Sequence, residues 1–174
     1  MAGLRAFSCY RNIERAYTRK SKYKRKSYIR TVPTSKIVKF IFGDKIKDFP
    51  YRVDLKSKQP LQVRHNAIES ARLMIVRRLN PRLGKNYRLQ IRQYPHHVLR
   101  ENKMITGAGA DRMQTGMQKA FGRPVGLAAR VKAGTIIFSV YVDKNGVDHA
   151  IKAVKDAFVK LPCTCAVAVQ ELKK

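Results

Sequence analysis

Acidic residues are scarce in this sequence, and several other features are missing. It contains 11 Asp and Glu against 38 Lys and Arg, 3 Cys and no Trp. An odd number of cysteines argues against a disulfide scaffold, and structural zinc needs paired ligand spacings that Cys163 and Cys165 do not supply. No apolar run approaches the roughly 20 residues of a membrane-spanning helix, and the first residues lack a signal-peptide core. We therefore expect no metal site, no cofactor, no membrane partner and a cytoplasmic location.

The surplus of positive charge indicates the class of partner. The formal net charge is +27 and the sequence pI is about 10.6. So many positive charges repel one another in the isolated protein, and nucleic acid is the partner that neutralises them. With 44% hydrophobic residues, the 174-residue chain can still bury a core. The composition predicts a folded nucleic-acid-binding protein.

Residues 1–36, which we call the arm, concentrate this charge. They contain eleven Lys and Arg and only one acid, Glu14, with tyrosines between the cations. Cations suit phosphates and tyrosines can stack on bases, so we expect the arm to be poorly ordered alone and ordered on RNA. A solvated, disordered tail is the alternative. The predicted RNA contacts in the arm are Arg5, Tyr10, Arg11, Arg15, Tyr17, Arg19, Lys20, Lys22, Tyr23, Arg25, Lys26 and Arg30.

Hydrophobic periodicity predicts a single α+β domain over residues 37–174, with mixed or antiparallel sheets and two main amphipathic helices. Apolar residues recur at helical spacing over 66–79 and 147–161. The first helix has a potential capping box in Asn66 and Glu69, and Asn80-Pro81 is expected to end it. Short β-branched or alternating runs predict strands over 36–42, 49–55, 87–94, 125–131, 134–142 and 165–169.

Two of these strands combine an apolar face with a cationic face. Tyr87, Leu89 and Ile91 alternate with polar residues that include arginines. Over 125–131, the apolar residues Val125, Leu127, Ala129 and Val131 share one face, and Arg130 lies on the other. We predict that the polar faces dock on RNA through Arg88, Arg92 and Arg130.

The stretch from 94 to 126 is basic and punctuated by glycine. Residues 102–111, which we call the glycine loop, hold few large apolar side chains, and Gly107 and Gly109 can adopt positive φ angles. Apolar residues then recur at helical spacing over 111–121, which predicts a short helix. The predicted RNA contacts around the loop are His96, His97, Arg100, Lys119 and Arg123. For one of the two histidines, simple packing is an equal alternative.

No constellation for catalysis accompanies these residues. The Gly107-Ala-Gly109 sequence fails as a dinucleotide-binding fingerprint because Arg112 occupies the third glycine position. His96 and His97 have no nucleophile or carboxylate pair nearby in sequence. We therefore predict no catalytic residues and no enzyme activity.

Four segments are specific enough to indicate a family: CYRNIERAYTRKSKY, VPTSKI, HNAIESAR and YPHHVLRENKMITGAGADRMQTGMQKAFGRPVGLAARV. Together they span residues 9 to about 135, and they resemble the archaeal and eukaryotic branch of the universal large-subunit ribosomal protein sixteen family. The resemblance implies an α/β-hammerhead-like α+β fold. It also implies a structural constituent of the large ribosomal subunit.

The resemblance further implies which molecules the chain contacts. The partners would be large-subunit rRNA, tRNA acceptor ends and neighbouring ribosomal proteins. The resemblance leaves open whether both the large and the small rRNA of that subunit are contacted. The glycine loop would face the peptidyl-transferase region and help to position tRNA. Its residues in that role would be Asn102, Lys103, Met104, Gly107, Gly109, Asp111 and Arg112.

Two other functions remain as alternatives. An RNA-modifying enzyme could use the glycine loop as a substrate clamp, but the missing nucleophile and acid–base set argue against it. A free regulatory RNA-binding module would have to stay soluble without RNA, which a charge of +27 disfavours.

Overall fold

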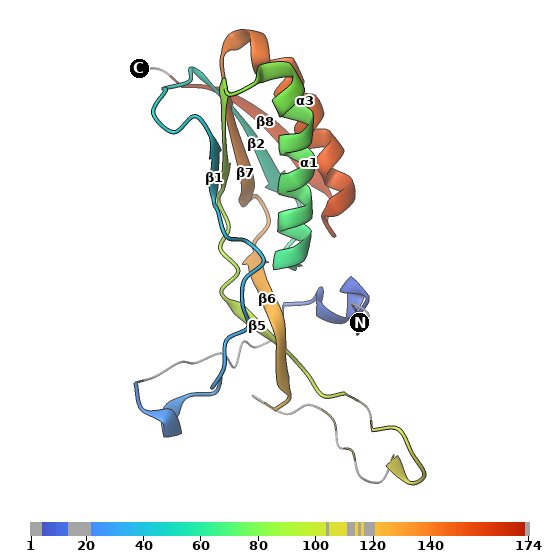
Figure 1. The fold of residues 1–174 in the computed structure, drawn as a ribbon. Helices are drawn as coiled ribbons and strands as arrows, with labels where there is room; N and C mark the ends of the chain where they lie inside the picture. The colour runs from blue at the N-terminus through green and yellow to red at the C-terminus, as the bar shows by residue number, and fades with distance from the viewer. Residues whose placement is uncertain are drawn as a thin grey trace.

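The computed structural model describes residues 5–13, 22–103, 105–110, 114, 116 and 121–172. Its described part forms two antiparallel sheets and two main helices, which confirms the predicted α+β class. The larger sheet and both helices form one end of an elongated molecule, and the smaller sheet leads away from them toward the glycine loop (Figure 1).

The larger sheet has five strands, and all its pairings are antiparallel. The most hydrophobic run of the sequence, Ile136–Val142, lies at its centre, and all of its residues except Ile136 are buried. The strands in spatial order are β1 (Ile41–Gly43), β4 (Tyr87–Ile91), β7 (Ile136–Val142), β2 (Tyr51–Ser57) and β8 (Cys165–Glu171).

Helices α1 (His65–Leu83) and α3 (Val147–Asp156) pack side by side on one face of this sheet (Figure 1). The predicted stripe of Ile68, Ala71, Ile75 and Leu79 is fully buried. The most buried side chains of α3 are Ala150, Ala153 and Val154, and Val147 and Ile151 flank them. The 3-10 helices η3 (Lys144–Gly146) and η4 (Ala157–Lys160) bracket α3, so the predicted helix over 147–161 changes character after Asp156.

Both predicted ends of α1 are wrong. The helix continues past Pro81 to Leu83, and Gly84 N–H caps the carbonyl of Asn80. Pro81 fits because its fixed φ is helical and the donor it lacks lies on the exposed side of the last turn. At the other end, strand β3 (Leu61–Arg64) leads directly into the helix and Arg64 occupies the N-cap.

The capping box is absent because its two residues have other partners. Asn66 lies inside the helix, where its Oδ1 accepts a hydrogen bond from the adjacent Ala67 N–H. The carboxylate of Glu69 accepts hydrogen bonds from the Arg72 guanidinium, one of them at 2.9 Å from Nε. An ion pair one turn along the helix therefore replaces the predicted cap.

Three further segments differ from expectation. Of the strand predicted over 36–42, only Ile41–Gly43 joins the sheet as β1. Residues 97–101, for which no strand was predicted, form strand β5 (His97–Glu101). A continuous helix over 111–121 is wrong at Gln114 and Gly116, which are not helical, and most other positions of that prediction lie outside the described residues.

The smaller sheet has the order β3–β6–β5, with β6 (Arg123–Val131) in the middle. Two described parts of the arm contact it. Near η1 (Phe7–Tyr10), the Arg11 carbonyl accepts a hydrogen bond from the Gln62 amide, at the free edge of β3. After η2 (Lys24–Lys26), Ile29 is buried against Val98 and Leu127.

These two contacts lie on opposite faces of the smaller sheet. The Gln62 side chain donates hydrogen bonds to the carbonyls of Tyr10 and Asn12 on one face. Strand alternation places Leu127 on the other face, because Gln62 pairs with Arg130, three positions further along β6. The arm therefore contacts both sides of the sheet, while the division of the chain at residue 36 stays a prediction.

Within the described ranges, no helix is long and apolar enough to cross a membrane.

Candidate nucleic-acid interface

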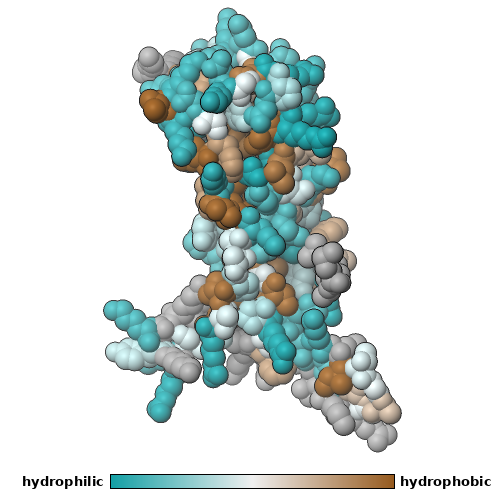
Figure 2. Space-filling model, viewed as in Figure 1, coloured by the Kyte–Doolittle hydropathy of each residue, from teal (hydrophilic) through white to brown (hydrophobic). Residues whose placement is uncertain are grey.

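A groove of about 1180 Å³ lies between the arm and the base of the glycine loop. Its walls come from arm residues 27–31, from residues 101–103 with Ile105, and from residues 121–125 at the start of β6. Among the described residues, its lining includes the three cations Arg30, Lys103 and Arg123 and the exposed rings of Tyr28 and Phe121. Hydrophilic side chains cover much of the molecule and project at the end away from the helices (Figure 2).

Ile29 fixes the arm beside this groove. Its side chain is buried with Val98 and Leu127, whereas its neighbours Tyr28 and Arg30 are exposed. Ile29 thus holds the segment on the smaller sheet, while the tyrosine and the arginine on either side of it stay exposed. Both exposed side chains line the groove.

Glu101 is the acid of the groove, and the arm neutralises it. Its carboxylate pairs with Arg5 Nε at 2.9 Å and accepts a hydrogen bond from the Tyr10 hydroxyl at 3.0 Å. Burial and this hydrogen bond raise the pKa of Tyr10. Because the negative charge is already paired, an anion in the groove meets a positive field.

The glycine loop is closed at its base by one side chain. Gln114 donates a hydrogen bond from Nε2 to the Lys103 carbonyl at 2.9 Å, and its Oε1 accepts one from the Ile105 amide at 3.0 Å. Between these points, Gly107 and Gly109 adopt φ angles of +148° and +71°, which confirms the predicted positive φ. The described part of the loop is therefore a turn whose two limbs are clamped together.

In the described part of the arm, two cations lie over aromatic rings and two others are exposed. Arg11 lies over the Phe7 ring, with its guanidinium carbon 5.7 Å from the centroid. Lys26 Nζ lies 5.2 Å from the centroid of Tyr23, whose side chain is 69% exposed. The other predicted contacts in this part of the arm, Lys22 and Arg25, are also exposed.

His97 and Arg130 form a half-buried polar cluster on the smaller sheet. His97 Nδ1 and the Nε and Nη2 atoms of Arg130 are buried without a hydrogen-bond partner. Burial, together with the nearby charges of Arg130 and Arg100, lowers the pKa of His97 to about 4. His97 is therefore neutral at physiological pH. Arg100 lies beside the groove, where its Nη1 donates to the Phe121 carbonyl at 2.9 Å.

Three predicted contacts lie away from the groove. Arg88 and Arg92 belong to the face of the larger sheet opposite the helices, where Arg88 covers the ring of Tyr141 and Arg92 reaches Gln90. His96 is exposed, and its ring lies 4.4 Å from that of Tyr94, which in turn stacks on Phe40.

The structure thus brings Arg30, Asn102, Lys103 and Arg123 together in the groove. Arg5 and Tyr10 contact the Glu101 carboxylate, which also lines the groove. It does not bring Arg88, Arg92 or the 96–97 pair into the groove. The remaining predicted contacts lie outside the described residues: Arg15, Tyr17, Arg19, Lys20, Met104, Asp111, Arg112 and Lys119.

Sequence reasoning missed the roles of three residues at this site. Phe121 adds an exposed ring to that of the arm tyrosine Tyr28, Gln114 clamps the loop, and Glu101 pairs with the arm. A lone acid within a cationic stretch is a usable signal for such a pairing. The role of Gln114 has no sequence signal, because both of its partners are backbone groups. Among the described residues, no cluster of three His, Cys, Asp or Glu could hold a metal ion.

A basic α+β protein with cations and exposed rings around an open groove belongs to the class that binds polyanions. Comparison with protein families places it further: residues 16–168 match the family model described as ribosomal protein L16p/L10e. The chain belongs to this family of ribosomal proteins. Membership in a family of structural ribosomal proteins confirms the prediction that the chain is not an enzyme.

Archaeal relatives match along most of the chain. The large ribosomal subunit protein uL16 of Staphylothermus marinus is 50% identical over 152 residues, 87% of each chain. Its counterpart in Methanococcus aeolicus is 44% identical over 167 residues, 95% of this chain and 94% of the relative. That of Metallosphaera sedula is 44% identical over 175 residues, 98% and 97% of the two chains. These matches confirm the family resemblance of the sequence.

Proposed function

We propose that the protein is a structural constituent of the large ribosomal subunit and binds large-subunit rRNA through the arm and the groove. The groove carries this proposal, because it combines Arg30, Lys103 and Arg123 with two exposed rings and has its acid already paired. Cations that meet phosphates and rings that stack on unpaired bases are the usual elements of RNA recognition. The names of the relatives support the same assignment.

Salt-dependent RNA binding tests this proposal. The variant Arg30→Ala/Lys103→Ala/Arg123→Ala removes the three groove cations. Its control, Arg77→Ala/Lys152→Ala/Lys155→Ala, removes three exposed cations from the helices. Binding to a large-subunit rRNA transcript is measured at several salt concentrations. We expect the groove variant to reduce the slope of log affinity against log salt by about 2, since each phosphate contact contributes roughly 0.7 to 0.9.

The control variant should leave that slope nearly unchanged. Equal losses in the two variants would show that net charge alone matters and would overturn the assignment to the groove. Incorporation of both variants into large subunits is then compared by mass spectrometry of purified particles. We expect lower occupancy for the groove variant only.

We further propose that the glycine loop positions tRNA acceptor ends near the peptidyl-transferase region, and that the chain also contacts neighbouring ribosomal proteins. Two observations support the role of the loop. It is clamped at its base by Gln114, and its described tip is open, since a Cβ on Gly107 or Gly109 would meet nothing within 4 Å. A narrow, clamped turn can reach a ligand without carrying the docking contacts of the domain.

Deleting residues 105–110 and joining the ends with a short linker tests the role of the loop. We expect normal occupancy of the variant in large subunits, because the arm and the groove cations remain. Peptide-bond formation by these subunits should be slower. A normal rate would show that the loop is dispensable, and absent occupancy would show that it is an assembly anchor.

A further inference from the structure

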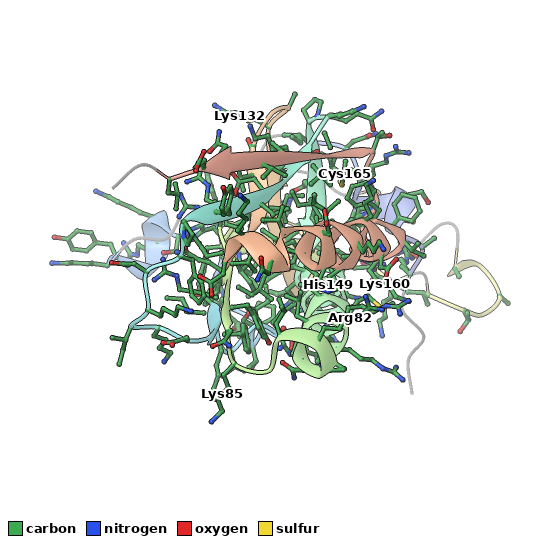
Figure 3. The ribbon with its side chains drawn as sticks, turned by 90° about the horizontal axis from the view of Figure 1, so that it is seen from above. Arg82, Lys85, Lys132, His149, Lys160 and Cys165 are labelled. Carbon is green, nitrogen blue, oxygen red and sulfur yellow. The ribbon has the colours of Figure 1, made fainter. Side chains whose placement is uncertain are left out.

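Cys163 and Cys165 form a close pair at the start of β8. Cys163 lies in the bend that follows η4, and Cys165 is the first residue of the strand. Figure 3 shows Cys165 at the same end of the sheet as Lys160, the last residue of η4. The Sγ atoms of Cys163 and Cys165 are 3.3 Å apart. In a straight strand, two positions are separated by roughly 6.6 Å, so the bend is what brings the sulfurs together.

The two thiols differ in exposure and surroundings. Cys163 is partly exposed, whereas Cys165 is buried and its Sγ also approaches the Cys163 carbonyl at 3.5 Å. The hydrogen bond from Cys165 lowers the pKa of Cys163 to about 7 against the opposing effect of burial, and Ser57 and the charge of Arg11 act in the same direction. The same interaction, with burial, raises the pKa of Cys165. One sulfur is thus the better nucleophile, and the other is its protonated neighbour.

We propose that Cys163 and Cys165 are a peroxide-sensitive dithiol, in which Cys163 attacks the oxidant and Cys165 resolves the product as a disulfide. This arrangement, a partly exposed nucleophilic cysteine beside a second cysteine, is the one that favours reversible oxidation. It is independent of the groove and of the proposed RNA binding, because neither cysteine lines that groove.

The chemistry is balanced by one hydroperoxide. The Cys163 thiolate attacks the O–O bond, forms an S–O bond and releases the second oxygen, which takes up a proton as water or an alcohol. The Cys165 sulfur then attacks Cys163 Sγ, the S–O bond breaks, and the hydroxide leaves as water with the Cys165 proton. Two thiols are oxidised to one disulfide, and one peroxide is reduced.

Cys9 provides a control within the same chain. It is exposed on η1, and the other two cysteines pair with each other. Trypsin separates the sites, since Cys9 falls in the peptide of residues 6–11 and both other cysteines fall in the peptide of residues 161–173. Exposure alone would make Cys9 the more reactive residue, so the proposal predicts the opposite order.

The test treats the full-length protein with equimolar hydrogen peroxide, blocks free thiols with iodoacetamide and maps the tryptic peptides by mass spectrometry. We expect the peptide 161–173 to lose two hydrogens and to become resistant to alkylation as its disulfide forms. This oxidation should be about tenfold faster than the oxidation of Cys9, and dithiothreitol should restore both thiols. Two free thiols in that peptide after treatment, or oxidation no faster than at Cys9, would overturn the proposal.

Two serine variants test the assigned roles. Cys165→Ser should leave Cys163 as a sulfenic acid that dimedone captures, and Cys163→Ser should leave Cys165 reduced. Equally fast oxidation of Cys165 in the Cys163→Ser variant would refute the order of attack. The measurement on the unsubstituted protein decides the disulfide itself, even where a variant folds poorly.

Discussion

The guanidinium carbon of Arg88 lies 4.5 Å from the ring centroid of Tyr141, its cross-strand neighbour on β7. The Tyr141 side chain is buried beneath it, with its hydroxyl 3.4 Å from Gln90 Oε1. Arg88 therefore covers the sheet as well as extending its cationic face. The side chain of Arg92 is exposed and donates a hydrogen bond to Gln90 Oε1 at the surface. The two arginines look equivalent in the sequence, but the structure gives them different surroundings.

Alanine substitutions should separate these two arginines. We expect Arg88→Ala to lower the free energy of unfolding by about 0.5 to 1 kcal/mol, the usual contribution of a cation–π contact. Arg92→Ala should change it by less than about 0.5 kcal/mol, as exposed substitutions usually do. Urea unfolding measures both values. Equal effects of the two substitutions would contradict this prediction, and Arg92→Ala is accordingly the cleaner probe of RNA docking by this face.

Gly43 should tolerate no side chain. Its φ is +83°, and an added Cβ would lie 2.0 Å from the Tyr87 carbonyl oxygen, on the partner strand. Positive φ alone costs a non-glycine residue about 1 to 2 kcal/mol, and the clash with the backbone adds to it. We expect Gly43→Ala to lower the free energy of unfolding by about 3 kcal/mol or to prevent folding.

Gly84→Ala is the matched control for that substitution. Gly84 also has a positive φ, +56°, but an added Cβ would meet nothing within 4 Å. Its cost should stay near about 1 to 2 kcal/mol, because only the backbone strain applies. Similar unfolding midpoints for the two variants in urea would show that the contact with Tyr87 is relieved at little cost.

Stability should depend on pH through His97. Its pKa is about 4 in the folded protein, below the ordinary value of 6.5, so the unfolded chain binds the proton more readily. The stability that neutral His97 contributes is therefore fully present above about pH 6.5 and is lost as the pH falls toward 4. We expect wild type to lose more unfolding free energy than His97→Gln between pH 6.5 and 4.

Above pH 6.5, the difference between these two proteins should be constant, because His97 is neutral in both the folded and the unfolded state. Carboxylates also titrate in the acidic range, but they are common to both proteins and cancel in the difference. NMR titration of the His97 ring provides an independent measurement. A ring that titrates near 6.5 would contradict the buried, cation-flanked environment.

Gln114 should control the order of the glycine loop without affecting the domain. Gln114→Ala removes hydrogen bonds to the Lys103 carbonyl and the Ile105 amide. We expect faster amide hydrogen exchange at Ile105, and an unfolding free energy within about 0.5 kcal/mol of wild type, since these hydrogen bonds are exposed. Gln93→Ala is a useful contrast, because Gln93 bonds the Ile136 carbonyl within the domain. Unchanged exchange at Ile105 would show that the loop is not held by this clamp.

Much of the fold followed from local periodicity. The stripe from Ile68 to Leu79 predicted a buried helix face, and the alternation of Tyr87, Leu89 and Ile91 predicted a strand with one buried side, as the structure shows. These patterns succeed because a helix or strand selects side chains at its own repeat. They failed at Pro81 and at residues 97–101, where a last helical turn and a polar strand carry no clear periodic signal.

By itself, the sequence determined the positive charge, the α+β class and the family. Only the tertiary structure decided that Ile29 anchors the arm against Val98 and Leu127, and that Tyr10 and Arg5 neutralise Glu101. Tyr10 and Glu101 are 91 positions apart. A pattern in sequence reports the repeat of one element, whereas a groove forms where separate elements pack, so its lining depends on contacts that no local spacing encodes.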